Sequence, residues 1–343
     1  MTTILLAIAT FPGGNFNDLA ASLSEATGKP AVVSLSSARG SMKSFSFDTA
    51  DEGAFGRTVL KEIGLMRAPG VTVVFHDGQL PSAKVSQKPW NQPESVSPKA
   101  FSAASVKAGK VTFRTEKTES LDLKTLAGFA KPVESHWFFE GLAIGVVAKD
   151  VPEMDFLGLV AKGIGGRFLN TSAAFKIDID PVDIRTRAVR TIQAEAIATE
   201  GDEAAILNKE RAFRIAALNA LSNEEMSRLL LQPGNQVRVA VRFGSPVEGA
   251  AVALIREMEA QQLRALRTER TPEDSRRADT LPRYVRGDTN FVGILNRVDT
   301  RRQAMLVINQ RFEASLEVPV VDGRGRTSTE RLFGGTAPRR GRG

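Results

Sequence analysis

The chain has no cysteine and only two histidines, His76 and His136, in 343 residues. Without cysteine there can be no disulfide, thiolate metal site or cysteine nucleophile, and the redox compartment is left open. Two histidines also exclude a histidine-rich metal centre. No apolar run reaches the ~18–20 residues that span a bilayer, so no transmembrane segment is expected. Hydrophobic residues make up 42% of the chain, which is enough to build a globular core without disulfides or metal sites.

Motifs of common enzyme classes are missing as well. The sequence contains no G-x-S-x-G elbow, Walker A loop, strand-borne G-x-G-x-x-G or H-E-x-x-H. His136 and Glu140 are four residues apart, but on an expected strand this spacing forms no metal-binding face. Asp178, Asp180 and Asp183 follow an expected strand, where a cation site and a solvated turn are alternatives and the turn is favoured. No catalytic, cofactor or metal residue is therefore predicted.

Positive charge gathers near the C-terminus. The net charge is +7, and the stretch from Arg256 onward holds 18 arginines, no lysine and 12 acids. Such asymmetry can indicate an acidic partner, which could be nucleic acid, an anionic surface or another protein. Acids are interleaved with the arginines, however, which favours a solvated surface of mixed charge.

Two stretches about a hundred residues apart follow one pattern. Residues 18–33 predict a helix, a Gly28 cap, a Lys-Pro break and a β-branched strand. Residues 121–132 predict a second helix with a Lys-Pro break, and the aromatic run His136 to Phe139 is then expected as a strand. Both stretches are therefore predicted to run helix, break, strand.

The similarity continues through a second helix in each stretch. Strands are expected at 44–47 and 142–147, and each precedes an acidic helix start, at 51–52 and 150–153. Apolar and basic positions of the two helices match in order: Phe55 with Phe156, Val59 with Val160, Lys61 with Lys162, and Ile63 with Ile164. Glycines end both helices, final strands are expected at 71–75 and 173–177, and first strands at 4–9 and 111–114. Each stretch therefore predicts a βαββαβ unit.

Residues 15–78 resemble the short N-terminal domain of secretins and TonB-dependent receptors. The likeness lies in Leu19, Leu23, the Thr27-Gly28 pair and the helix between Asp51 and Gly64. Residues 150–177 resemble the second half of the same domain. The resemblance implies a periplasmic-type interaction module and no particular activity.

The apolar run Ile4 to Ala9 has two interpretations. It resembles the core of a signal peptide, but no Lys or Arg precedes it and no Ala-x-Ala site follows. The repeat favours a buried strand. A cell-envelope or periplasmic location is the expectation, and a cytoplasmic one follows if the run is a strand and not a leader.

The predicted fold class is α+β: two tandem small βαββαβ modules followed by a third α+β domain with an amphipathic helix. The third domain is expected to contain helices over 202–221 and 248–267, a capping box at Ser222 and Glu225, and strands at 236–243, 291–295, 304–309 and 311–321. Trp90 lies in the Pro-, Ser- and Lys-rich linker and is expected to pack on a neighbouring domain. The predicted boundaries are 1–78, a linker 79–110, 111–180, 181–321 and a disordered Arg/Gly tail 322–343.

Several arginines are candidates for contacts to nucleic acid. Gly163 to Arg167 matches the G-x-x-G pattern of KH domains, although a helix cap explains the glycines more simply. The full candidate set is Arg167, Arg238, Arg242, Arg339, Arg340 and Arg342.

The sequence is compatible with three classes of function. The first is a non-enzymatic structural or interaction protein of the cell envelope, with a protein partner or self-association. The second is a nucleic-acid-binding protein that uses the basic C-terminal region. The third is an enzyme with an acidic site assembled in space.

Overall fold

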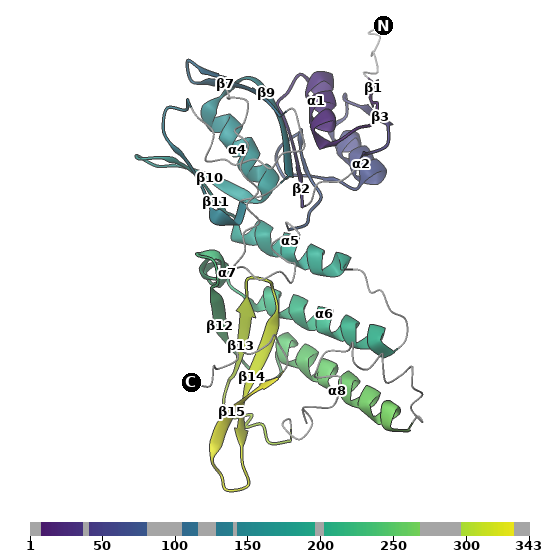
Figure 1. Cartoon of the computed structure of the whole chain (residues 1–343), viewed down its shortest axis with the longest axis vertical. Coiled ribbons are helices and arrows are strands. Elements are labelled where there is room, and N and C mark those ends of the chain that lie inside the picture. Colours follow the sequence, from purple (N-terminus) through teal and green to yellow (C-terminus); the bar gives the residue numbers. More distant parts are fainter. Residues whose placement is uncertain are drawn as a thin grey trace, which may run out of the picture. The chain divides into compact units, whose positions relative to one another are not determined.

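The structure, a computed structural model, describes residues 8–36, 41–80, 105–115, 128–139, 143–195, 202–267 and 296–332. The chain contains both helices and sheets, which is the predicted α+β class (Figure 1). The chain divides into two compact units, Met1–Thr191 and Ile192–Gly343. Both expected modules therefore belong to the first unit. Among the described residues, no helix is both long and apolar enough to cross a membrane.

The first segment of the first unit covers residues 8–80. Its elements are β1 (Ile8–Phe11), α1 (Phe16–Thr27), β2 (Ala31–Leu35), β3 (Phe45–Asp48), α2 (Glu52–Ile63), β4 (Met66–Arg67) and β5 (Val74–His76). The expected first strand at 4–9 lies partly outside the described residues, and β1 begins at Ile8.

Local sequence signals set the helix ends of this segment. The Asn15 side chain accepts hydrogen bonds from the backbone N–H groups of Asn17 and Asp18, and Asp18 accepts one from the Asn15 N–H. This capping box starts α1, and Gly28 ends it in the left-handed conformation. Asp51 caps α2 with its side chain, and Gly64 ends that helix. The ends at Gly28 and Gly64 and the acidic start of α2 were predicted from neighbouring residues in the sequence, whereas the capping box at Asn15 was not.

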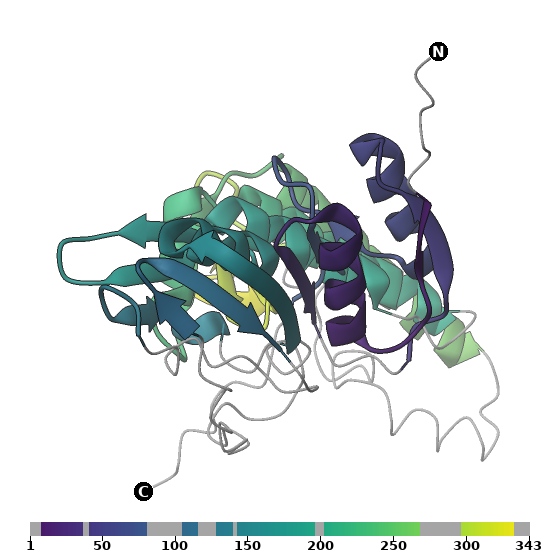
Figure 2. The same cartoon turned by 90° about the horizontal axis from the view of Figure 1, so that it is seen from above.

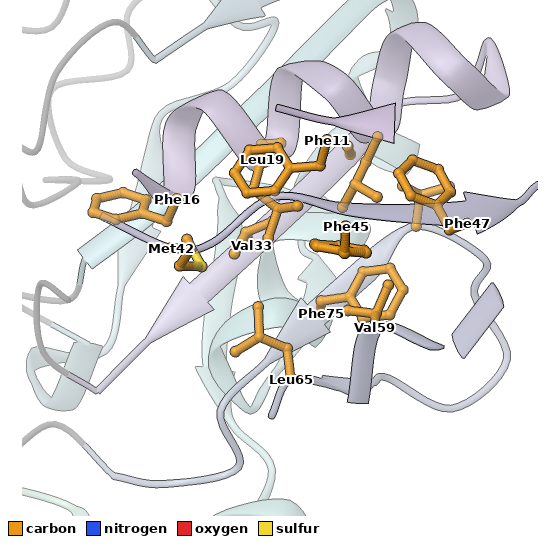
Figure 3. Packing of buried hydrophobic residues seen from close by; sticks show 14 of the residues in the cluster. Phe11, Phe16, Leu19, Val33, Met42, Phe45, Phe47, Val59, Leu65 and Phe75 are labelled. Carbon is orange, nitrogen blue, oxygen red and sulfur yellow. The ribbon is translucent and has the colours of Figure 1, made fainter. Parts of the chain in front are cut away.

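Phenylalanines dominate the core of the first segment (Figure 3). Phe11, Phe45, Phe47, Phe55 and Phe75 form a chain of ring contacts with centroids 5.1–5.7 Å apart. They come from β1, β3, α2 and β5, so the rings join strands that are far apart in sequence. Aromatic pairs at these separations stabilise a core beyond the area that they bury.

The second segment covers residues 105–179. Its elements are β6 (Ser105–Lys107), β7 (Lys110–Arg114), β8 (Val133–Ser135), the 3-10 helix η2 (Trp137–Phe139), β9 (Ala143–Pro152), α4 (Glu153–Ile164), β10 (Gly166–Asn170) and β11 (Phe175–Ile179). Residues 116–127, with most of the expected helix 121–132, and Trp90 lie outside the described residues.

The strands of the two segments pair in the same way. The first strand pairs antiparallel with the third in each, β1 with β3 and β7 with β9. The second pairs parallel with the last, β2 with β5 and β8 with β11. The fourth pairs antiparallel with the last, β4 with β5 and β10 with β11. One set of three pairings thus describes both segments. The extra strand β6 at the start of the second segment has no counterpart in the first.

Three expectations for the second segment are wrong. The run His136 to Phe139 forms a turn and η2, because His136 Nδ1 accepts a hydrogen bond from the Phe138 N–H and folds the backbone back. Residues 105–107 of the expected linker form β6, which pairs with β7. Asp150 lies inside β9, and α4 begins at Glu153 without a side-chain cap.

The second unit is built from helices and one antiparallel sheet. Its elements include α6 (Asp202–Ala220), α7 (Asn223–Leu230), β12 (Gln236–Val241), α8 (Pro246–Arg267), β13 (Ala304–Asn309), β14 (Ala314–Val321) and β15 (Thr327–Leu332), and the boundary between the units falls inside α5 (Pro181–Ala194). Ser222 and Glu225 form the predicted capping box. The sheet order is β12-β13-β14-β15. The expected strand 291–295 lies outside the described residues.

The prediction of a disordered tail from residue 322 is wrong for residues 327–332. These residues form β15, the edge strand that pairs with β14 along its length. Asp322 organises the connecting turn, because its carboxylate accepts hydrogen bonds from the backbone N–H groups of Arg324 and Arg326 and from the Arg326 guanidinium. These hydrogen bonds hold the pKa of Asp322 below its usual value. The Gly-Arg composition that suggested disorder belongs to this turn.

Candidate functional site: the shared sheet and its edges

One six-stranded sheet, in the order β4-β5-β2-β9-β7-β6, joins the two segments (Figures 1 and 2). The joint is the antiparallel pair of β2, from the first segment, and β9, from the second. Five register pairs run from Ala31 with Val147 to Leu35 with Ala143. All five residues of β2 are buried, which is typical of a strand covered on both faces. The sequence predicted a strand here from the β-branched pair Val32 and Val33, but it did not predict burial on both faces, because the polar Ser34 interrupts the apolar run.

On one face of the joint, α1 lies close to the backbone of β9. Gly145 is the register partner of Val33, and a Cβ at Gly145 would lie 2.8 Å from the carbonyl oxygen of Phe16 and 3.1 Å from Asn17 Oδ1. No side chain fits between α1 and β9 at this point. The close approach requires glycine, so the first segment packs directly on the backbone of the second.

The opposite face of the joint carries α4. A Cβ at Gly163 of α4 would lie 2.7 Å from Cγ1 of Val32. Val32 and Val33 are neighbours on β2 and therefore point to opposite faces of the sheet. Each segment thus contributes one helix that covers the other segment's strand: α1 covers β9, and α4 covers β2.

The strands β3 and β8 correspond to β9 and β2, and among the described residues neither pairs with a strand of the other segment. Among the described residues, β3 of the first segment pairs only with β1, and β8 of the second pairs only with β11. Their counterparts in the pairing scheme, β9 and β2, are the two strands of the joint. Ser44, Ser46 and Glu134 at these edges are exposed, and Ser135 is half-buried. Unpaired N–H and C=O groups at such edges can accept a further strand.

A buried arginine fastens α5 to the end of α4. Arg187 is 3% exposed; its Nε donates to Asp183 Oδ2 at 2.9 Å, and its NH2 group donates to the carbonyl of Gly163 at 3.1 Å. Burial lowers the pKa of the guanidinium, and Asp183 opposes this shift. The arginine also satisfies a carbonyl that the end of a helix leaves without an intrahelical partner. These contacts assign Arg187 a structural role.

Near Arg187, His76 lies buried at the end of β5. Burial is the main cause that lowers its pKa to about 3, and the positive charges of Arg187 and Arg190 lower it further. The neighbouring Asp77 accepts hydrogen bonds from the Ser36 hydroxyl at 2.7 Å and the Ser36 N–H at 2.8 Å. His76 is therefore neutral at physiological pH.

The first unit is expected to lose stability as the pH falls below about 6.5. The unfolded chain protonates His76 near that pH, whereas the folded chain does so only near pH 3. Between these values the unfolded state binds the extra proton, so the free energy of unfolding falls by up to ~1.4 kcal/mol per pH unit. Urea denaturation of wild type and His76→Phe between pH 6.5 and 4.5, above the range of most carboxylates, measures this slope. Equal slopes for the two proteins would contradict the assignment.

The arginines proposed for nucleic-acid contacts are divided between the two units of the chain. Arg167 forms an ion pair with Asp178, and Arg238 with Glu317. Arg238 and Arg242 are exposed at alternate positions of β12 and its end, as the alternation predicted, but they belong to the second unit and Arg167 to the first. Arg339, Arg340 and Arg342 lie outside the described residues. Contacts of these arginines to nucleic acid stay a prediction.

The motifs in the first unit serve structural purposes. Gly165 caps α4 in the left-handed conformation, and its N–H donates to Ala161, so the glycines of the G-x-x-G match end a helix and lead into β10. Of the three expected acids, Asp178 pairs with Arg167, Asp180 accepts from the backbone at the start of α5, and Asp183 pairs with Arg187. No group of three acids or histidines among the described residues is arranged to hold a metal ion.

An open groove of about 770 Å³ runs beside the joint. Asp18 and Glu25 of α1 line it, with Arg114 and Lys149 of β7 and β9. Both signs of charge are present, so this lining does not favour a polyanion over a protein surface.

Comparisons with protein families, with curated proteins and with solved structures found no match for this chain.

Proposed function

We propose that this chain is a non-enzymatic structural protein that acts through protein–protein contacts of two tandem copies of one βαββαβ module. The observation that carries the proposal is the common strand pairing of the two segments. The registers agree as well: Val32 pairs with Val74 in the first segment, and Glu134 with Lys176 at the matching place in the second. Two copies of one unit would produce such agreement, whereas unrelated segments have no reason to share it.

The way in which the segments meet supports a role in assembly. Their contact is a sheet edge completed by a strand of the other segment, with a helix laid over each face. This is β-augmentation, a common way for proteins to bind one another through backbone hydrogen bonds. A module that joins its neighbour in this way within one chain can use its equivalent edges, on β3 and β8, between chains.

The apparent mass of the chain in a gently lysed native extract tests this function. We expect the chain, at 37.0 kDa, to sediment in a larger complex that survives nuclease treatment. Sedimentation as a monomer before any treatment would contradict a role in assembly. Collapse to monomer size after nuclease alone would instead favour the nucleic-acid-binding class.

A cell-envelope location is part of the proposal and is supported by the resemblance to secretin-type domains. N-terminal sequencing of the native protein tests it. A mature N-terminus beyond Ala9 would establish export and remove part of β1 (Ile8–Phe11). An intact Met1 would support the strand and would count against processing by a signal peptidase.

A further inference from the structure

We propose that a second copy of this chain pairs its β8 with β3 of the first copy, in the antiparallel arrangement that joins β2 to β9 within the chain. This inference rests on the proposed function and names the partner. Within the chain, the second strand of one module meets the third strand of the other. In the part of the chain that the structure describes, the second strand of the second module, β8, and the third strand of the first, β3, are left for the same contact.

The register of this contact follows from the internal one. Ser135 takes the place of Val33, because Val33 pairs with Phe75 and Ser135 with the matching Ile177. Ser44 takes the place of Gly145, because each lies seven residues before the N-cap of the next helix, Asp51 or Pro152. Since Val33 opposes Gly145 in the joint, Ser44 of one chain should oppose Ser135 of the next.

Burial of the equivalent helices supports the same contact. In α4, which covers the other module's strand, the buried residues are Glu153, Phe156, Leu157, Val160, Ala161, Gly163 and Ile164. In α2, of equal length, only Phe55 and Val59 are buried. Leu60 of α2 is 48% exposed, although Ala161 at the matching place of α4 is fully buried. The helix α2 therefore lacks the cover that α4 receives, and a neighbouring β8–β11 pair would supply it.

Such a contact joins different surfaces of the two chains. It is heterologous, so each added chain presents the same free edge again, and growth ends only if the rotation closes a ring. With another copy of this chain as the partner, association must depend on the concentration of the chain itself.

Cysteine cross-linking tests the contact cleanly, because the natural chain has no cysteine. Full-length Ser44→Cys and isotope-labelled full-length Ser135→Cys chains would be mixed and mildly oxidised, and the mass of the disulfide-linked dimers measured. We expect mixed dimers to form at least about tenfold faster than in a mixture of Ser328→Cys and Ser135→Cys, because docking raises the local thiol concentration. Ser328 is an exposed serine of β15 and serves as the matched control.

A second pair of variants separates docking from random collision. Leu60→Lys, added to both cysteine chains, should abolish the excess rate, whereas Leu169→Lys, at a leucine 38% exposed on β10, should leave it unchanged. The proposal would be overturned if the Ser44→Cys and Ser135→Cys chains cross-linked no faster than the Ser328→Cys and Ser135→Cys chains. It would also be overturned if two Ser44→Cys chains cross-linked with each other faster than Ser44→Cys did with Ser135→Cys. A nuclease-resistant native complex together with a failed cross-link would leave the proposed function standing and overturn only the choice of partner.

Discussion

Gly145→Ala is expected to lower the free energy of unfolding of the first unit by about 2 kcal/mol. The added Cβ would lie 2.8 Å from the Phe16 carbonyl oxygen, closer than the two atoms can approach, so α1 and β9 must separate. Urea denaturation followed by circular dichroism measures the change. The effect is large because the clash is with the backbone of α1 and no side chain can rotate away from it.

Gly158→Ala is the matched control for this prediction. Gly158 lies in α4, and a Cβ there meets no atom within 4 Å. Alanine in a helix interior is better than glycine by roughly 0.5–1 kcal/mol, so this variant should be slightly more stable than wild type. The two Gly→Ala changes are thus expected to have opposite signs. A Gly145→Ala protein as stable as wild type would mean that α1 does not lie on β9.

Arg187→Met is expected to cost the first unit about 2–3 kcal/mol. The change removes the charge that Asp183 pairs with and the donor to the carbonyl of Gly163, at a site 3% exposed. Denaturant unfolding of the purified variant measures the loss. Arg187→Lys should recover part of the stability, because it restores the charge without the planar fork of donors.

An exposed arginine of the same unit provides the comparison for Arg187. Arg57 of α2 is exposed, so Arg57→Met should change stability by no more than about 0.5 kcal/mol. If the two Arg→Met variants lost similar small amounts, the buried contacts of Arg187 would carry little of the stability assigned to them.

Helices were predictable from the sequence because the signals that start and end them lie in neighbouring residues. The capping box at Ser222 and Glu225 and the glycine that ends α2 depend on residues within one turn. Strands that depend on distant partners were harder to place. Residues 327–332 became β15 because β14 offers them an edge, and nothing in their polar composition indicates that edge.

The joint between the segments could be predicted only in part. The β-branched residues Val32 and Val33 indicated a strand, and the matched helices indicated a repeat, but nothing in the sequence indicated that this strand is buried on both faces. The sequence could not show that β2 would pair with β9, because β2 already has a partner in β5 within its own segment. Gly145 permits the close approach of α1, but a glycine in a strand can equally mark a bulge or a bend, so its presence did not predict the contact.

Nuclear magnetic resonance of the deuterated chain tests whether β2 and β9 pair in one sheet. If the two segments share one sheet, the backbone protons of Val33 and Gly145 give a cross-strand nuclear Overhauser effect, as do those of Ala31 and Val147. Cross-strand signals that connect β9 to β7 but never to β2 would show that the two segments do not share a sheet and are separate bodies on one chain.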